Sequence, residues 1–139
     1  MNGSTTVAGT MYLAHLAGIK VFVTGGIGGV HRGVESTMDI SADLTELSRT
    51  PVTVISAGVK SILDVAKTLE FLETMGVPVV TYKSDWFPDF FTRNSGIKTV
   101  FRIDTPKECA SMIDFNDKLR MKNGILVTVP VPEDKEADS

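Results

Sequence analysis

Short runs of β-branched and aromatic residues alternate along the chain with segments of helical periodicity, and this alternation restricts the fold more than any other feature. The runs at residues 21–24, 52–56, 77–82, 99–103 and 124–128 each predict a buried strand. Strands separated by helices of this length form a parallel sheet with helices on its faces. The sequence therefore predicts one α/β domain with a mostly parallel sheet and helices on both faces.

The predicted helices carry start and stop residues. Residues 4–6 cap a first helix that runs to about residue 17 and ends at Gly18. Ser61 opens a capping-box pattern before a second helix, which Gly76 ends. Pro106 lies in the first turn of a third helix, where proline is tolerated.

Composition excludes several classes of protein. The 139 residues are enough for about one domain, and a net charge of -3 argues against a nucleic-acid partner. The single cysteine, Cys109, cannot form an internal disulfide or a cysteine-based metal cluster. No apolar run approaches the roughly 18 residues that a membrane span needs. We expect a cytoplasmic protein without a membrane partner, organelle targeting being left open, with a domain at 1–132 and a disordered acidic tail at 133–139.

One long segment, residues 25–51, shows little periodicity and exceeds the roughly 2–6 residues of an ordinary α/β loop. Leu44 and Leu47 could anchor a helical turn or two inside it. It begins with the glycine-rich stretch 25–33, which contains His31 and matches neither standard phosphate-binding fingerprint. Two interpretations are open: a flexible turn with positive φ angles, or a loop that binds an anion through its amides.

Three carboxylates follow in the same segment: Glu35, Asp39 and Asp43. Carboxylate oxygens are the ligands that hard cations such as Mg²⁺ and Mn²⁺ prefer. The alternative is that Ser41 or Asp43 caps a helix, and the pattern alone favours capping.

Lys60 follows a predicted strand and immediately precedes the helix predicted from Ser61. A helix N-terminus disfavours a positive charge, so this position suits an amine that acts as a nucleophile, as Schiff-base lysines do. The alternative is a lysine that extends into solvent.

These segments together resemble the pseudouridine-5'-phosphate glycosidase family, also called the indigoidine synthase A-like family. The resemblance covers nearly the whole chain. The matching stretches are residues 5–8, 18–33, 39–47, 56–64, 72–80 and the aromatic loop 84–96.

The resemblance implies reversible cleavage of the C–C glycosidic bond of pseudouridine 5'-phosphate to uracil and ribose 5-phosphate. Such a bond has no leaving-group oxygen to protonate, so two-carboxylate glycoside hydrolysis is a poor match. Family members instead open the ribose ring and attach C1' to a lysine, and the resulting imine acts as an electron sink while the bond to uracil breaks. That lysine corresponds to Lys60.

Further roles are implied residue by residue. Asp39 matches the ligand of a divalent metal, usually manganese (or magnesium), and Asp43 matches a residue that helps proton transfer during ring opening. His31 matches a residue of the same pocket, near the ribose or a metal-bound water. The positions that match substrate-binding residues are Val7, Thr24, Ser41, Ala42 and Asp43. The family forms homotrimers, so a homo-oligomer is expected.

The chain is shorter than members of this family, so its fold should be incomplete relative to theirs. An acidic proton donor and a substrate-binding lysine of the family's N-terminal part have no counterpart here, and we expect little glycosidase activity from the isolated chain. Two alternatives follow: an inactive fragment that serves as an oligomerisation partner, or a lysine-dependent aldolase-like lyase that uses the same Lys60.

Overall fold

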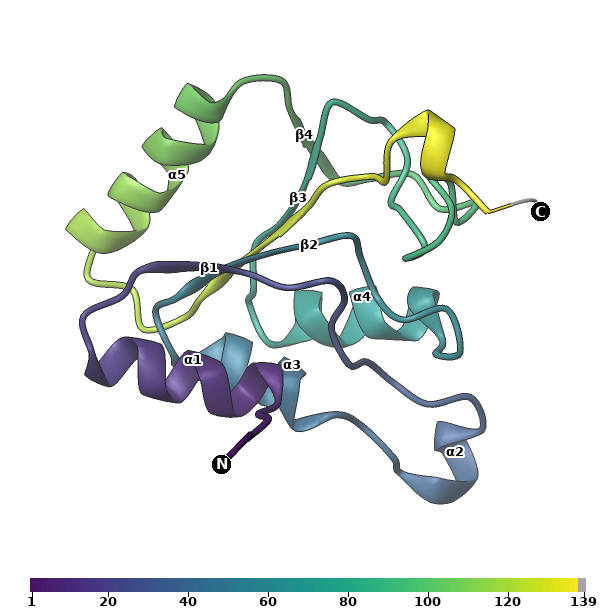
Figure 1. The fold of residues 1–139 in the computed structure, drawn as a ribbon, viewed down its shortest axis with the longest axis horizontal. Coiled ribbons are helices and arrows are strands. Elements are labelled where there is room, and N and C mark those ends of the chain that lie inside the picture. Colours follow the sequence, from purple (N-terminus) through teal and green to yellow (C-terminus); the bar gives the residue numbers. More distant parts are fainter. Residues whose placement is uncertain (138–139) are drawn as a thin grey trace.

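Every pair of neighbouring strands in the sheet is parallel, as the alternation of strands and helices predicts. The structure, a computed structural model that describes residues 1–137, contains a five-stranded sheet in the order β1-β2-β5-β3-β4 (Figure 1). The strands are β1 (Val21–Val23), β2 (Thr53–Ser56), β3 (Val79–Tyr82), β4 (Phe101–Ile103) and β5 (Ile125–Thr128). The last strand in sequence thus lies at the centre of the sheet.

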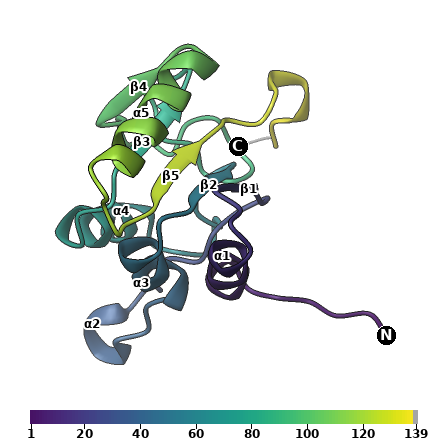
Figure 2. The ribbon, with the colours of Figure 1, turned by 90° about the vertical axis from the view of Figure 1, so that its left-hand side faces the viewer.

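Helices cover both faces of this sheet. Helices α1, α3 and α4 lie on one face, and α5 lies on the other (Figures 1 and 2). The helices are α1 (Val7–Leu16), α2 (Val34–Thr37), α3 (Ala42–Arg49), α4 (Val65–Thr74) and α5 (Pro106–Lys118). The predicted α/β class with a parallel sheet is confirmed.

The apolar side chains form two clusters, one on each side of the sheet, and β5 contributes to both. Leu126 packs in the cluster that includes Met11 of α1 and Leu72 of α4. Its neighbours Ile125 and Val127 point the opposite way and pack in the cluster beside α5. Successive side chains of a strand point to opposite faces of the sheet, and both faces are buried at this central strand. The strand is therefore apolar at successive positions.

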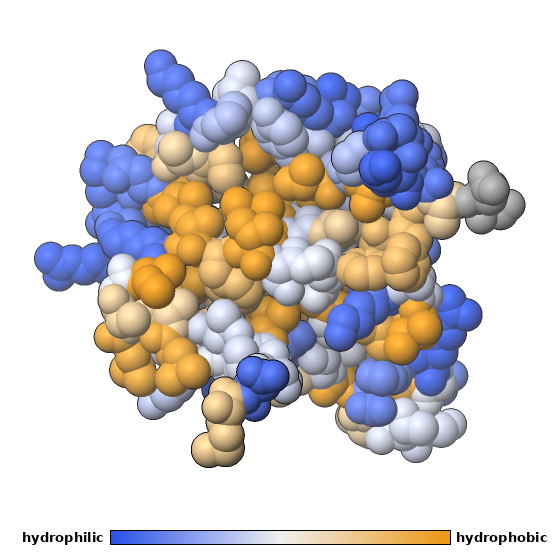
Figure 3. All heavy atoms as spheres, viewed as in Figure 1, coloured by the Kyte–Doolittle hydropathy of each residue, from blue (hydrophilic) through white to orange (hydrophobic). Residues whose placement is uncertain are grey.

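One part of the α5 side of the sheet is open to solvent. Val23 of the edge strand β1 is 73% exposed, and Phe115 and Leu119 of α5 are 65% and 70% exposed. Lys20 pairs with Asp117 at 2.9 Å, so the residue that precedes β1 lies beside α5. Figure 3 shows apolar side chains gathered over β1 and the neighbouring end of α5. Strands of parallel sheets are ordinarily covered on both faces, so this surface is an exception within the fold.

The long segment between β1 and β2 contains more helix than its periodicity suggested. Helix α3 places Leu44 and Leu47 in the core with no exposed surface, so these two residues anchor a helix of two turns. Ser41 is its N-cap and accepts a hydrogen bond from the Asp43 N–H at 3.1 Å. Of the two capping residues considered, Ser41 is therefore the one that caps.

The second predicted helix begins later than expected. Helix α4 starts at Val65, and its N-cap is Asp64, whose carboxylate accepts the Lys67 N–H at 3.0 Å. Ser61 instead lies in a turn in which the Leu63 N–H donates to the Lys60 carbonyl at 3.0 Å. Asp caps as well as Ser does, and here the Asp64 amide is also held by Val30, so the prediction of a cap at Ser61 is wrong.

The acidic end of the chain contains a 3-10 turn at Glu133–Lys135. The Ala137 N–H donates to the Phe91 carbonyl at 2.9 Å. Residues 138–139 of the predicted tail lie outside the described residues. The predicted domain boundary at residue 132 stays a prediction.

Glu46 of α3 gives the stability of the fold a dependence on pH. Burial raises the pKa of its carboxyl group, whereas hydrogen bonds from Thr50 and Arg49 lower it. The net pKa lies below its ordinary value. A carboxyl group with a lowered pKa stabilises the folded state above its unfolded pKa, near 4.3, and this contribution is lost as the pH falls through the folded pKa.

We therefore expect Glu46→Gln to flatten the fall in unfolding free energy between about pH 5 and pH 3. Urea denaturation across this range measures the slope. Glu70→Gln, which changes an exposed carboxylate of α4, is the control and should retain the wild-type slope. Equal slopes for wild type and Glu46→Gln would contradict the assignment.

Candidate functional site

A pocket of about 560 Å³ lies beyond the end of β1, where the chain passes into the glycine-rich loop. The carboxyl ends of parallel strands are where α/β sheets ordinarily bind ligands. The residues that line it are Thr5, Thr6, Val7, Thr24, Gly26, Gly28, His31, Ser41, Asp43, Lys60, Ile62 and Leu63. They come from four segments of the chain, which the fold brings together.

Six of the eight predicted site residues line this pocket: Val7, Thr24, His31, Ser41, Asp43 and Lys60. Two do not. Ala42 is exposed in the first turn of α3, and Asp39 is exposed just before that helix. The roles assigned to all eight stay predictions, because shared lining establishes proximity and not chemistry.

Asp43 joins three parts of the pocket. Its Oδ1 accepts the Ala8 N–H at 2.8 Å, from the first turn of α1, and its Oδ2 accepts the Gly28 N–H at 2.8 Å, from the glycine-rich loop. The residue itself lies in α3 and is only 7% exposed. A carboxylate has about four lone-pair sites, so each oxygen keeps one for a ligand in the pocket.

The backbone of the glycine-rich loop contradicts the interpretation of a turn whose glycines have positive φ angles. Gly33 has a positive φ of 78°, but Gly25, Gly26, Gly28 and Gly29 do not. Positive φ is therefore not the reason for these four glycines. A flexible turn does not describe the loop.

Close packing is the reason for at least three of these glycines. A Cβ on Gly26 would lie 2.6 Å from the Phe90 ring, and one on Gly28 would lie 2.3 Å from Ser41 Oγ. A Cβ on Gly29 would lie 2.5 Å from Thr68 Oγ1. Any larger residue at these positions would have to displace its neighbours.

Four of the nine amides in the loop donate to acceptors within the protein itself. Ile27 donates to the Gly58 carbonyl at 3.1 Å, and His31 donates to the Asp39 carbonyl at 3.0 Å. Gly28 donates to Asp43, as described above, and Val30 donates to a threonine hydroxyl of α4. An external anion would have to displace these acceptors, so the anion-binding interpretation does not fit these four amides.

Lys60 is held at its backbone while its side chain is exposed. Its N–H donates to the Ile27 carbonyl at 3.2 Å, and Val59 pairs with Ile27 as in a parallel sheet. Helix α4 begins five residues later, and the helix dipole acts only within about the first turn. The dipole argument for Lys60 is therefore wrong, although the residue does line the pocket.

Lys67 provides a contrast with Lys60. It pairs with Glu35 at 3.0 Å and with Asp64 at 3.6 Å. The hydrogen bond and charge of Glu35 raise the pKa of the Lys67 amine. Among residues 1–137, Lys60 forms no salt bridge. The two lysines thus differ in that Lys67 has carboxylate partners and Lys60 has none among these residues.

The three carboxylates considered for a metal site lie apart. Glu35 pairs with Lys67, and Asp43 accepts two backbone amides. Asp39 lies beside His31, with 3.6 Å between Oδ2 and Nδ1. Across the described part of the chain, no three or more His, Cys, Asp or Glu residues gather as metal ligands. The Asp39 carboxylate by itself fits a divalent cation that keeps most of its water, as Mg²⁺ commonly does.

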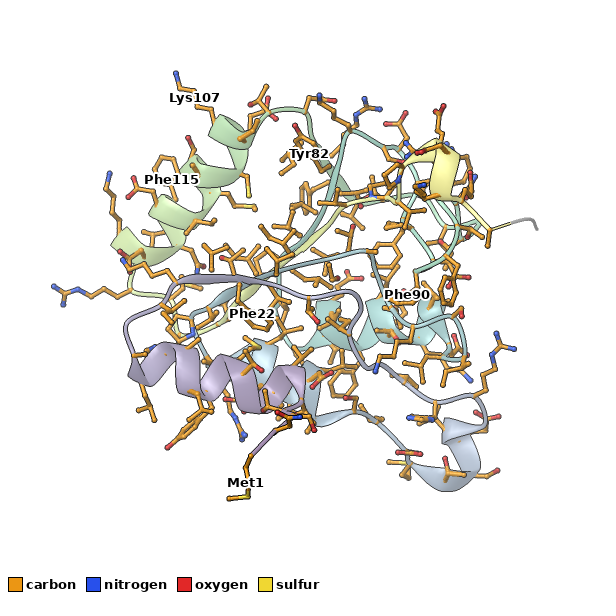
Figure 4. All side chains as sticks on the ribbon, viewed as in Figure 1. Met1, Phe22, Tyr82, Phe90, Lys107 and Phe115 are labelled. Atoms are coloured by element: carbon orange, nitrogen blue, oxygen red, sulfur yellow. The ribbon has the colours of Figure 1, made fainter. Side chains whose placement is uncertain are left out.

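The aromatic loop between β3 and β4 packs behind the glycine-rich loop. Phe90 has a positive φ of 38°, which non-glycine residues rarely adopt, and its ring lies against Gly25 and Gly26 (Figure 4). Asp89 pairs with Gly58, whose own Cβ position would lie 2.5 Å from the Pro88 carbonyl oxygen. The ends of β1 and β2 are thus covered by a tightly fitted loop.

Sequence reasoning missed several lining residues, among them Thr5, Ile62 and Leu63. It also missed Thr68, a fully buried polar residue of α4 that contacts the glycine-rich loop. The available signal was a threonine on the apolar face of a helix, between Val65 and Leu72. Such a residue must satisfy its hydroxyl group inside the protein.

Within residues 1–137, no helix is both long and apolar enough to cross a membrane.

Comparison with known proteins gives consistent matches over the whole chain. The family described as "Indigoidine synthase A like protein" matches residues 1–139. The pseudouridine-5'-phosphate glycosidase of Methylobacterium nodulans is 60% identical over 136 residues, covering 98% of this chain and 40% of the relative. The enzyme of the same name from Arabidopsis thaliana is 58% identical, covering 98% of this chain and 41% of the relative.

Two solved structures share the fold. The prealnumycin C-glycosynthase AlnA, in complex with ribulose 5-phosphate, superposes with a TM-score of 0.93 at 44% identity, covering 99% of this chain and 45% of AlnA. An indigoidine synthase A-like protein from Thermotoga maritima superposes with a TM-score of 0.91 at 42% identity, covering 99% and 46%. The chain therefore spans less than half the length of the relatives that it matches.

The packing of the glycine-rich loop leads to a test of its rigidity. In Gly28→Ala the new methyl group would meet Ser41 Oγ and Asp43 Oδ2, at 2.3 and 2.9 Å. Overpacking of this kind costs about 1–3 kcal/mol, so the free energy of unfolding should fall by that amount. Gly3→Ala adds the same methyl group where nothing lies within 4 Å and should change stability by less than about 0.5 kcal/mol. If the two variants were equally stable in urea, the tight packing described here would be refuted.

Proposed function

Because the chain belongs to the indigoidine synthase A-like family, we propose that it takes part in reversible cleavage of pseudouridine 5'-phosphate to uracil and ribose 5-phosphate. The observation that supports this most directly is the pocket in which Lys60, Asp43 and His31 meet. The names of the relatives support the reaction, and the ribulose 5-phosphate bound to AlnA supports a pentose phosphate as ligand. Since the chain spans less than half of these relatives, the activity is proposed for an assembly that contains it.

Lys60 would form the covalent link to the sugar. Its neutral amine condenses with the C1' aldehyde of ring-opened ribose 5-phosphate, releasing one water and forming an imine. In the synthetic direction C5 of uracil donates an electron pair to C1' of the protonated imine, the imine nitrogen becomes an amine, and C5 loses its proton. The C4' hydroxyl of the sugar then attacks C1', loses its proton and displaces the Lys60 amine, which closes the ring and frees the lysine. Cleavage is the reverse, and hydrolysis of the imine returns the water and frees ribose 5-phosphate. Lys60 lines the pocket and has no carboxylate partner among residues 1–137, and such a lysine suits this chemistry.

Asp43 and His31 would move protons between the sugar and water. Asp43 lines the pocket, and its remaining lone pairs would accept a ribose hydroxyl proton during ring opening. Val7, Thr24, Ser41 and Ala42 would bind the substrate. The Ser41 hydroxyl can still donate to a ligand, because its oxygen accepts the Asp43 N–H.

Asp39 would hold a divalent metal, manganese or magnesium. When bound, the metal supplies positive charge that can balance the phosphate and hydroxyl oxygens of the substrate. Asp39 lies outside the pocket lining but beside His31, which lines it, so the two residues connect such a site with the pocket.

A second function remains supported by one observation. The open apolar surface over β1 and α5 favours a role as an oligomerisation partner, because exposed apolar side chains such as Val23 and Phe115 are typical of surfaces that a further polypeptide segment covers. A homotrimer is the arrangement that we propose. The aldolase-like alternative would use Lys60 in the same way on a different carbonyl substrate.

Lys60 is expected to be the lysine that borohydride traps with ribose 5-phosphate, as detected by mass spectrometry of proteolytic peptides. Lys60→Arg should abolish the adduct, since a guanidinium remains protonated. Lys67→Arg is the matched control and should leave the adduct unchanged, because the raised pKa of Lys67 keeps its amine charged. An adduct on Lys20 or Lys67 would disprove the assignment, and trapping with small keto acids in preference to ribose 5-phosphate would favour the aldolase.

Manganese binding is expected to depend on Asp39. Titration with Mn²⁺ should broaden the amide NMR signals of Met38, Asp39 and Ile40 through the unpaired electrons of the ion, and Asp39→Asn should remove this effect. Glu35→Gln, which changes a nearby carboxylate already paired with Lys67, should leave it intact. Broadening that follows Glu35 instead, or that is absent from the wild type, would contradict this site.

A further inference from the structure

Thr68 of α4 contacts the glycine-rich loop, and its hydroxyl group both donates and accepts a hydrogen bond. The side chain has no exposed surface. Its Oγ1 donates to the Asp64 carbonyl at 2.7 Å within α4 and accepts the Val30 N–H at 2.9 Å. The hydrogen bond to Val30 spans 38 positions in sequence, so it fixes the loop against a helix that itself does not line the pocket.

Val30 lies between two residues that depend on its position. Gly29 precedes it and has no room for a side chain, because Thr68 Oγ1 would lie 2.5 Å from its Cβ. His31 follows it and lines the pocket. Val30 also pairs with Ile40 and Asp64, and it is 3% exposed. A displacement of Val30 would therefore carry His31 with it.

We propose that Thr68 is a positioning residue, which sets the place of His31 in the pocket through its hydrogen bond to the Val30 amide. The relevance to pentose phosphate binding rests on the proposed function, whereas the geometric role does not. Without the hydroxyl group the Val30 N–H would be buried without an acceptor, and a buried polar group in this state favours any movement that restores a partner. The loop would then shift toward solvent at the point where it carries His31.

Three variants separate this role from simple packing. Thr68→Val removes the hydroxyl group and keeps the shape, and Thr68→Ser keeps the hydroxyl group and removes a methyl. Thr81→Val is the matched control: Thr81 also has no exposed surface, and its hydroxyl group bonds to Thr99 and Thr128, in the sheet. It reports the general cost of deleting a buried hydroxyl group.

The readouts are NMR signals of the 139-residue chain. Amide hydrogen exchange of Val30 should be about fivefold faster in Thr68→Val, relative to the amide of Val127 in the central strand, because loss of one hydrogen bond is worth about 1 kcal/mol. The chain contains two histidines, His15 and His31, so a histidine-labelled sample gives one ring signal for each. In Thr68→Val the His31 signal should move and that of His15 should not. Thr68→Ser and Thr81→Val should resemble wild type at Val30 and His31.

A titration with ribose 5-phosphate then connects position with binding. In wild type the amides of Gly28 and His31 should shift, and Thr68→Val should weaken the affinity about fivefold or more while Thr68→Ser stays within about twofold. Absence of binding by the wild-type chain would count against a pentose phosphate as the ligand of this pocket, whereas the exchange and histidine results would still decide the role of Thr68.

The proposal is overturned if Val30 exchange is unchanged in Thr68→Val, or if Val30 and Val127 accelerate equally, since that is general destabilisation. It is also overturned if Thr68→Ser behaves like Thr68→Val, because the methyl group would then be what matters. Should Thr68→Val not fold, the wild type provides a further measurement: a slowly exchanging Thr68 hydroxyl proton with a nuclear Overhauser effect to the Val30 amide. Its absence would refute the hydrogen bond.

Discussion

The carboxylate of Asp43 connects the parts of the molecule on which the pocket depends. One oxygen accepts a hydrogen bond from a backbone N–H of α1, and the other accepts one from a backbone N–H of the glycine-rich loop. The residue itself belongs to α3. These three segments are separated along the chain and have no strand in common. A short, mostly buried carboxylate can hold them together because charge-assisted hydrogen bonds are stronger than those between neutral groups.

This arrangement gives the glycines a different meaning from the usual one. In many nucleotide-binding proteins glycine-rich loops leave their amides free for phosphate. Here the Gly28 amide binds Asp43 and the Val30 amide binds Thr68, so the loop is bound by the protein on two sides. Glycine is needed at positions 28, 29 and 26 because the side chains of Ser41, Thr68 and Phe90 lie too close to leave room for a Cβ. The loop is consequently a closely packed wall of the pocket, which Gly26 and Gly28 line with their backbone.

Much of the fold follows from the sequence, because its strands and helices are encoded locally. The runs of β-branched and aromatic residues predicted all five strands within a few residues. Thr6 caps the first helix, and Pro106 lies in the first turn of α5, as the preferences of these residues predict. The start of α4 could not be predicted in this way, since Ser61 and Asp64 are both good caps and the choice depends on the contact between Asp64 and Val30. The same limit applies to Thr68, whose partner is 38 positions distant. The resemblance pointed to six residues that line one pocket, but it could not reveal what holds them there.

The uncovered surface over β1 has a thermodynamic consequence. Unfolding raises the heat capacity of a protein in proportion to the apolar area newly exposed to water. Val23 and Phe115 are 73% and 65% exposed in the folded chain, so they contribute less to that increment than buried side chains do. A polypeptide that covered them would remove this area from water and bind with a negative change in heat capacity, which is the most reliable calorimetric sign of apolar burial. Because this surface is uncovered, the heat-capacity change on unfolding should be smaller for the isolated chain than for the same chain within a complex.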